Sequence, residues 1–219
     1  LALIISFLIE FLDNTLKTID EIEKYSLSVL GIIPAIGQPT KNKKRWNGKL
    51  SVIDSPQNLK RRLITKEDPK SPISEAYRSL RTSMLFSTSK EIKSILVSSA
   101  GPGEGKTTTV ANLAITYANL GKKTILVDTD LRRPVVHKVF NLDREPGVTN
   151  FLAGQTDEIA TLVKKTDIEN LSIITSGVIP PNPSEILGSQ RMIDMLRKLE
   201  SEWDMVLFDS PPLVAVTDA

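Results

Sequence analysis

The sequence predicts an α/β fold with a mainly parallel sheet and helices on both faces. Three short apolar runs, at residues 94–97, 124–130 and 205–209, are separated by segments with helical periodicity. Apolar runs of this length that alternate with helices are typical of parallel strands buried on both faces. A glycine-rich loop follows the first run directly, and the other two runs end in carboxylates. We therefore expect ligand-binding groups to gather at the carboxyl edge of the sheet.

The glycine-rich loop reads Ala-Gly-Pro-Gly-Glu-Gly-Lys-Thr at residues 100–107, a Walker A pattern with Ala100 in place of the usual first glycine. Glycines allow the backbone to fold back and to point successive N–H groups at one centre, where the following helix also presents its positive end. Lys106 is placed to reach the β- and γ-phosphates of a nucleotide, and the Thr107 hydroxyl is placed to ligate Mg²⁺.

A glycine-rich turn without a ligand is the alternative interpretation of this loop. The apolar run before it and a helix expected from Val110 to Leu120, stopped by Gly121, favour a P-loop NTPase-type sheet instead. The expected nucleotide-binding residues are Gly101, Pro102, Gly103, Glu104, Gly105, Lys106, Thr107 and Thr108.

Three carboxylates end the other two apolar runs. Asp128 and Asp130 form the end of the second run, and Asp209 ends the third. An aspartate at a strand end is often only a turn or cap residue, but three of them behind a P-loop are hard to explain in that way. Because parallel strands open their carboxyl ends on one edge, we expect these side chains to converge on the phosphates.

Composition narrows the class of protein without identifying it. The chain has 219 residues, a net charge of +2 and no cysteine. The length fits one core-sized domain of about 150 residues with an appendage. The basic clusters at residues 41–45 and 60–62 are not interleaved with aromatic residues as in single-strand binders, so no nucleic-acid partner is expected.

Several motifs together resemble those of the bacterial tyrosine kinases of capsule and exopolysaccharide assembly. The P-loop, the block Asp-Thr-Asp-Leu-Arg-Arg-Pro at residues 128–134 and the block Asp-Ser-Pro-Pro at residues 209–212 all match the family's Walker motifs. The related partition and cell-division ATPases carry an additional lysine where this chain has Gly101. The resemblance covers essentially the whole chain.

The resemblance implies phosphoryl transfer from MgATP to a tyrosine hydroxyl, a reaction that depends mostly on positioning and charge neutralisation. The expected catalytic residues are Lys106, Asp128, Asp130 and Asp209, and the expected metal site is Thr107, Asp128 and Asp209. By resemblance, Asp128 orients or deprotonates the acceptor hydroxyl, while Asp130 shares that role or holds the metal shell. ATP and Mg²⁺ are the expected cofactors.

A second motif lies in a helix expected to start at Ser71-Pro72, a favourable N-cap and first turn. Glu75, Arg78 and Arg81 fit the family's Glu-x-x-Arg-x-x-Arg pattern, and Glu75 and Arg78 can pair within the helix. A charged, solvated face would explain them equally well. The resemblance implies that they contact a neighbouring subunit in a homo-oligomeric ring. The apolar stripe Ile73, Tyr77, Leu80 and Met84 is expected to face the core.

The N-terminal residues suggest a membrane-proximal segment before the sheet. Residues 1–9 are almost wholly apolar but too few to span a bilayer, so we interpret residues 1–17 as the cytoplasmic end of a transmembrane helix. A buried amphipathic helix is the alternative. Residues 18–70 are expected to form a juxtamembrane activator and linker, with a possible strand at 49–53, and residues 71–219 a tyrosine kinase domain. By resemblance, the segment before residue 71 belongs to a chain-length-regulator module that is fused to the kinase in cis. The resemblance also implies that the protein lies in the inner membrane with its kinase domain in the cytoplasm.

Two other functional classes share parts of this pattern. A P-loop ATPase switch of the partition or cell-division type would use Lys106, Thr107 and Asp209, but the missing lysine at Gly101 counts against it. A non-catalytic scaffold that sets polysaccharide chain length would not need the intact set of carboxylates. By resemblance, the rest of the kinase domain and its acceptor tyrosine cluster are expected beyond Ala219, and protein tyrosines are the expected substrates.

Overall fold

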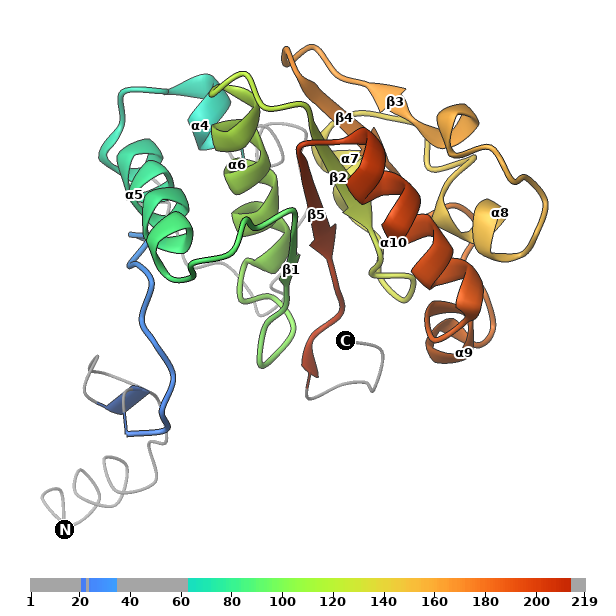
Figure 1. The fold of residues 1–219 in the computed structure, drawn as a ribbon, viewed down its shortest axis with the longest axis horizontal. Coiled ribbons are helices and arrows are strands. Elements are labelled where there is room, and N and C mark those ends of the chain that lie inside the picture. Colours follow the sequence, from blue (N-terminus) through green and yellow to red (C-terminus); the bar gives the residue numbers. More distant parts are fainter. Residues whose placement is uncertain (1–20, 23, 35–62, 214–219) are drawn as a thin grey trace, which may run out of the picture.

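The computed structural model describes residues 21–22, 24–34 and 63–213. Its centre is a five-stranded sheet in the order β1-β5-β2-β4-β3 (Figure 1). The strands are β1, Ser94–Val97; β2, Thr124–Asp128; β3, Lys164–Lys165; β4, Leu171–Ile174; and β5, Met205–Asp209. All neighbours pair in parallel except β3, which runs antiparallel to β4. The predicted mainly parallel sheet is confirmed.

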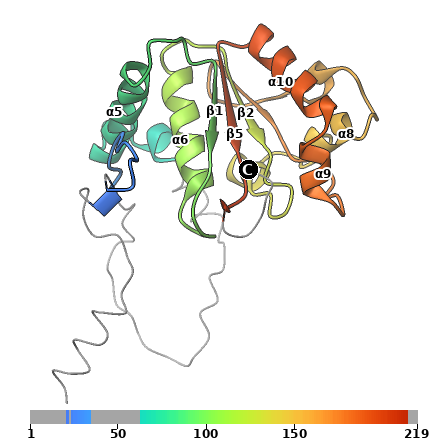
Figure 2. The same ribbon diagram turned by 60° about the horizontal axis from the view of Figure 1, so that its bottom comes forward.

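Helices cover both faces of the sheet, as predicted. Figure 2 shows α5 and α6 on one side and α8, α9 and α10 on the other. The helices are α4, Ile64–Glu67; α5, Pro72–Phe86; α6, Lys106–Ala118; α7, Val136–Val139; α8, Val148–Leu152; α9, Pro183–Leu187; α10, Gln190–Glu202; and a 3₁₀ helix, η1, Ile159–Leu162.

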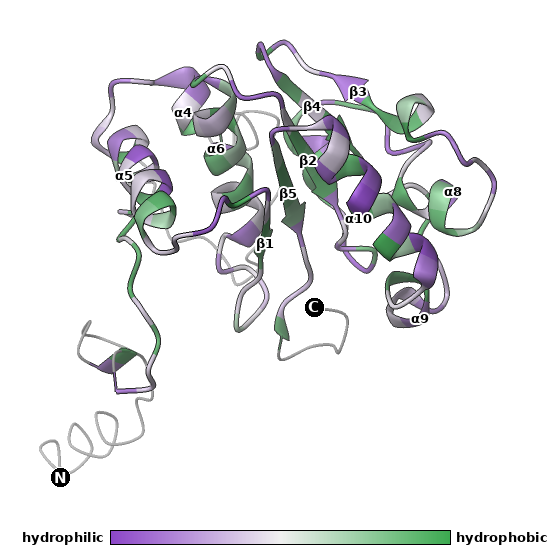
Figure 3. Ribbon diagram, in the orientation of Figure 1, coloured by the Kyte–Doolittle hydropathy of each residue, from purple (hydrophilic) through white to green (hydrophobic). Residues whose placement is uncertain are grey.

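The central strands alternate their side chains between two hydrophobic clusters, as strand geometry requires. Leu126 and Leu207 belong to the cluster under α6, whereas Val127 and Phe208 belong to the cluster under α8 and α10. Every residue of β2 and β5 is buried, and Figure 3 colours these strands as apolar. In the described part of the chain β1 forms an edge of the sheet, with Leu96 55% exposed.

The helix predicted after Ser71 is α5, and its start has the expected cap. The Ser71 hydroxyl accepts a hydrogen bond from the Ser74 N–H at 3.1 Å, and Pro72 is the first helical residue. Tyr77 is buried, as predicted for the core-facing stripe. Its other three members, Ile73, Leu80 and Met84, are half-buried.

The helix after the P-loop begins at Lys106, four residues before its predicted start, and its last residue is Ala118. The sequence did not reveal this first turn because Lys106 to Thr109 are polar and carry no apolar periodicity. Gly121 has φ +80° and ends the turn that follows the helix. The strands expected at 94–97 and 205–209 match β1 and β5, and the run at 124–130 contains β2, which ends at Asp128.

The segment before residue 71 also contributes to the core. Leu63 and Thr65 are 6% and 3% exposed, and α4 packs against α6 and α5. The transmembrane helix end expected at residues 1–17 and the strand expected at 49–53 lie outside the described residues. Within residues 21–22, 24–34 and 63–213, we find no helix that is both long and apolar enough to cross a membrane.

Candidate nucleotide site

The P-loop joins the end of β1 to the start of α6, as its sequence predicts. Gly103 and Gly105 have φ values of +83° and +94°, which side chains with a Cβ rarely adopt. Gly105 is the N-cap of α6, so the free N–H groups of the first helical turn lie beside the loop. This is the backbone arrangement that binds phosphate.

Strand register brings two of the predicted carboxylates next to the loop. Val97, the last residue of β1, pairs with Asp209 on β5, and Asp209 pairs in turn with Asp128 on β2. The Thr107 hydroxyl donates a 2.7 Å hydrogen bond to Oδ2 of Asp209. The hydroxyl predicted to hold Mg²⁺ therefore already contacts the Asp209 carboxylate.

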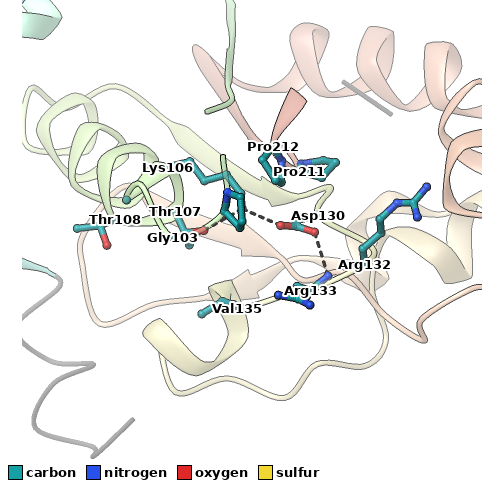
Figure 4. Close-up of a pocket in the computed structure, with 12 residues that line it drawn as sticks. Gly103, Lys106, Thr107, Thr108, Asp130, Arg132, Arg133, Val135, Pro211 and Pro212 are labelled. Atoms are coloured by element: carbon teal, nitrogen blue, oxygen red, sulfur yellow. Dashed lines mark hydrogen bonds and ion pairs between the residues drawn. The ribbon is translucent and has the colours of Figure 1, made fainter. Parts of the chain in front are cut away.

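Lys106 points toward two of the three acids. Its Nζ lies 2.7 Å from Oδ2 of Asp130 (Figure 4). The same Nζ lies 3.6 Å from Oδ1 of Asp209. Oδ1 of Asp130 accepts a 3.0 Å hydrogen bond from the N–H of Arg133. The lysine predicted to neutralise phosphate thus balances the charge of these acids in the structure.

Burial perturbs the two strand carboxylates. Asp209 is fully buried, and this burial raises its pKa to about 6 even though Lys106 and the Thr107 hydroxyl favour the charged form. Burial, followed by the charges of Asp209 and Asp130, raises the pKa of Asp128 well above its usual value. The N–H of Val136 donates to Oδ2 of Asp128 at 3.3 Å and opposes this shift only in part.

A cavity of about 700 Å³ opens over the P-loop (Figure 4). It is lined by Pro102, Gly103, Gly105, Lys106, Thr107, Thr108, Asp130, Arg132, Arg133, Val135, Pro211 and Pro212. Of the predicted site residues, Gly101, Glu104, Asp128 and Asp209 are not among the lining residues. Asp128 and Asp209 lie behind the cavity wall because they are the last residues of buried strands.

Five lining residues were not predicted as site residues: Arg132, Arg133, Val135, Pro211 and Pro212. The signal was present in the sequence for four of them, which lie within the blocks that carry the family resemblance, and Val135 directly follows the first block. Arg132 also donates a 3.3 Å hydrogen bond to the Ser184 hydroxyl on α9.

Comparison with known proteins assigns this site to a family. A family profile described as an AAA domain matches residues 92–218. The tyrosine-protein kinase YwqD of Bacillus subtilis is 43% identical over 162 residues, which cover 74% of this chain and 68% of that protein. The chain belongs to the bacterial tyrosine-protein kinase family.

Other members of this kinase family agree in sequence and in structure. The putative tyrosine-protein kinase CapB of Staphylococcus aureus is 39% identical, with coverage of 72% of this chain and 69% of CapB. The kinase domain of the Escherichia coli tyrosine kinase ETK matches with a TM-score of 0.76 at 30% identity, covering 92% of this chain and 75% of that structure. The tyrosine-protein kinase wzc of Salmonella typhimurium is 34% identical, but this chain spans only 27% of its length.

The site of this kinase family member fits a magnesium ion. Oδ1 of Asp128 and Oδ1 of Asp209 are buried and have no hydrogen-bond partner in the part of the chain that the structure describes. Buried carboxylate oxygens without a hydrogen bond, beside a hydroxyl, are hard ligands of the kind that Mg²⁺ binds. The described residues contain no cluster of three acidic, histidine or cysteine side chains able to hold a metal. Mg²⁺ usually keeps several waters and uses phosphate oxygens, so one or two carboxylates are sufficient.

The predicted interface residues of the kinase lie on α5, and all three have partners within the chain. Arg78 pairs with Glu75 at 2.7 Å, as predicted, and also donates to the Pro69 carbonyl. Nη1 of Arg81 donates a 2.5 Å hydrogen bond to the carbonyl of Thr116 near the end of α6. The positive charge of Arg81 is therefore used inside the molecule, where it caps a carbonyl near the C-terminus of α6.

Proposed function

We propose that this chain is an ATP-dependent protein-tyrosine kinase that regulates the polymerisation and export of a capsular polysaccharide or exopolysaccharide. The observation that carries the proposal is the arrangement of Lys106, Thr107 and Asp209 at the P-loop, in a chain that belongs to the tyrosine kinase family. The role in polysaccharide assembly rests on the family resemblance.

In this proposal the P-loop N–H groups and Lys106 bind the phosphates of ATP. Lys106 would exchange its contacts with Asp130 and Asp209 for contacts with the β- and γ-phosphates, which requires only a movement of its flexible side chain. Thr107, Asp209 and Asp128 would hold Mg²⁺. When bound, Mg²⁺ supplies neutralisation of the charge that develops on the transferred phosphoryl group.

The acceptor hydroxyl would meet Asp130 or Asp128. Asp130 lines the cavity, whereas Asp128 is fully buried behind it, and this difference favours Asp130 as the acid that orients the hydroxyl. Val135, Pro211 and Pro212 add apolar surface to the same cavity. Such surface suits the aromatic ring of a tyrosine.

Phosphotyrosine formation in an added substrate tests this function. The chain would be incubated with labelled ATP, Mg²⁺ and a random Glu-Tyr copolymer, with labelled phosphotyrosine and free phosphate both measured. We expect label on tyrosine that is lost in Lys106→Met and kept in the control Lys165→Met, because Lys165 is an exposed residue of β3. Release of free phosphate without phosphotyrosine would indicate an ATPase switch. Neither product would indicate a non-catalytic scaffold.

We propose further that the kinase acts as a homo-oligomeric ring at the inner membrane. Its site would face the cytoplasm and its regulator would be a chain-length-regulator module fused in cis. Glu75 and Arg78 are two-thirds and one-third exposed, respectively, so their ion pair lies on the surface where a neighbouring subunit can reach it. Sedimentation of the chain at several concentrations and salt levels tests the ring.

A further inference from the structure

A buried asparagine links the P-loop helix to the segment that precedes the kinase core. Asn112 is 0% exposed in the middle of α6, between the apolar residues Ala111 and Leu113. Its Nδ2 donates a 2.8 Å hydrogen bond to the carbonyl of Thr108. Its Oδ1 accepts hydrogen bonds from the N–H of Thr65 at 3.0 Å and from the Thr65 hydroxyl at 2.8 Å. Both ends of the amide are thus used to hold two different segments.

The hydrogen bond to Thr65 completes the start of α4. The N–H groups in the first turn of a helix have no partner within the helix and need an acceptor from elsewhere. Leu63, the N-cap of α4, makes no side-chain cap hydrogen bond. Asn112, 47 residues away in the sequence, supplies the acceptor that a serine or aspartate cap would normally supply.

The hydrogen bond to Thr108 reaches the nucleotide cavity. Thr108 lines the cavity and directly follows Thr107, whose hydroxyl contacts Asp209. A single side chain therefore joins the backbone of α4 to the first turn of the P-loop helix. Because a buried amide is costly unless its polar atoms are bonded, loss of either α4 or the first turn of α6 as a partner would remove hydrogen bonds from the Asn112 amide, so both segments stabilise it together.

The position of α4 is also set from α5. The Ser74 hydroxyl lies 2.6 Å from the carbonyl of Asp68 and 3.3 Å from that of Ile64. Lys66 forms an ion pair with Asp167 at 2.5 Å on the surface. Movement of the chain before residue 71 would thus be transmitted to Asn112 through a helix held at several points.

We infer that Asn112 is a positioning residue through which docking of residues 63–67 and nucleotide binding at the P-loop stabilise each other. Such coupling is reciprocal: nucleotide tightens the docking of α4, and a displaced α4 weakens nucleotide binding. The segment before the core is thereby made part of the phosphate site. This inference rests on the nucleotide site of the proposed function, and it adds to that site a means of control from the N-terminal side.

The test measures MgADP affinity and the hydrogen exchange of the amides of residues 65–68. In the wild-type chain, MgADP should slow exchange at these amides. Asn112→Leu, which replaces the amide with an apolar group of similar size, should weaken MgADP binding about tenfold and abolish the slowing. Thr65→Val, which keeps the backbone N–H and loses only the hydroxyl, should weaken binding by a smaller factor. If Asn112→Leu does not fold, Thr65→Val carries the test alone.

Thr116→Val is the matched control, since Thr116 is a buried threonine on the same helix whose hydroxyl, among the described residues, bonds to the Leu113 carbonyl and not to α4. This variant removes a buried hydroxyl, as Thr65→Val does. It should nevertheless keep the wild-type affinity for MgADP, and MgADP should still slow hydrogen exchange at the α4 amides. Unchanged MgADP affinity in folded Asn112→Leu and Thr65→Val, or α4 amides that ignore MgADP in the wild type, would overturn the inference. Because these measurements do not require phosphoryl transfer, a chain that shows the coupling but makes no phosphotyrosine would contradict only the proposed kinase activity.

Discussion

The ammonium group of Lys106 lies 2.7 Å from Oδ2 of Asp130, and the two side chains are only 12% and 4% exposed. The P-loop lysine and an acid that lines the same cavity therefore form an ion pair, which a nucleotide bound through Lys106 would open. Phosphate binding and release of Asp130 would then occur together, which makes the acid available to an acceptor hydroxyl once ATP is in place.

We expect Lys106→Met to abolish nearly all phosphoryl transfer, because the phosphates lose their main side-chain cation in a site shielded from water. The fold should persist, with the exposed Lys165→Met as the control. Labelled phosphotyrosine and circular dichroism would be measured on both variants. Retention of more than about a tenth of the activity, a barrier change below about 1.4 kcal/mol, would show that the loop is assigned wrongly.

Asp209→Asn and Asp130→Asn should differ in what they lose. Asp209 contacts Thr107, so loss of its charge should weaken both nucleotide affinity and the dependence on Mg²⁺. Asp130 lines the cavity, so Asp130→Asn should spare MgATP binding more than it spares transfer. Binding titrations with and without Mg²⁺, beside turnover, separate the two effects. Equal losses of binding would instead identify Asp130 as a residue of the metal shell.

The stability of the metal-free and nucleotide-free chain should fall as pH rises. The pKa of Asp209 increases from 3.8 in the unfolded chain to about 6 in the fold, so the folded state binds the extra proton between these values. The contribution of Asp209 to the free energy of unfolding is then fully present below about pH 4 and is lost as pH rises through about 6, a difference of roughly 3 kcal/mol. Urea unfolding in chelator should show this slope, flattened in Asp209→Asn.

The exposed Asp143→Asn serves as the control for that experiment and should leave the slope in place. An identical slope in Asp209→Asn and in the wild-type chain would mean that Asp209 does not titrate in this range.

The two arginines of α5 should have separate roles. Arg81→Ala should destabilise the fold by about 1–2 kcal/mol, because it removes a charged hydrogen bond to the end of α6. Glu75→Ala with Arg78→Ala should leave stability nearly unchanged, since exposed ion pairs contribute little, while weakening the proposed ring. Urea unfolding and sedimentation would be measured on both variants. An unchanged oligomer in the double variant would leave this helix as a solvated surface.

Tyrosine exposure predicts where this chain can phosphorylate itself. Tyr77 and Tyr117 are each 2% exposed, whereas Tyr25 is 72% exposed. We expect mass spectrometry after incubation with MgATP to find phosphate on Tyr25 alone, with Tyr25→Phe removing self-modification but not transfer to an added tyrosine polymer. Phosphate on Tyr77 or Tyr117 of the folded chain would contradict this.

The sequence was sufficient for features that depend on local pattern. The strands of the apolar runs, the P-loop and the convergence of Asp130 and Asp209 at Lys106 all follow from hydrophobic runs, glycines and the rule for parallel sheets. The contact of Thr65 with Asn112 could not be predicted, because an asparagine in an apolar helix gives no sign of a partner 47 residues away. The sequence also could not show that Asp130 lines the cavity while Asp128 lies buried behind it. This difference depends on the path of the chain after β2, which no periodicity specifies.

The place of β1 in the sheet has a consequence for inactivation by heat. The strand that carries the phosphate loop lies at an edge of the described sheet, whereas Asp128 and Asp209 end strands whose residues are all buried. Edge elements with exposed surface detach at lower free energy than the core. On warming, the chain should therefore lose nucleotide binding while the strands that carry Asp128 and Asp209 are still paired. Activity should accordingly fail at a lower temperature than the bulk of the fold.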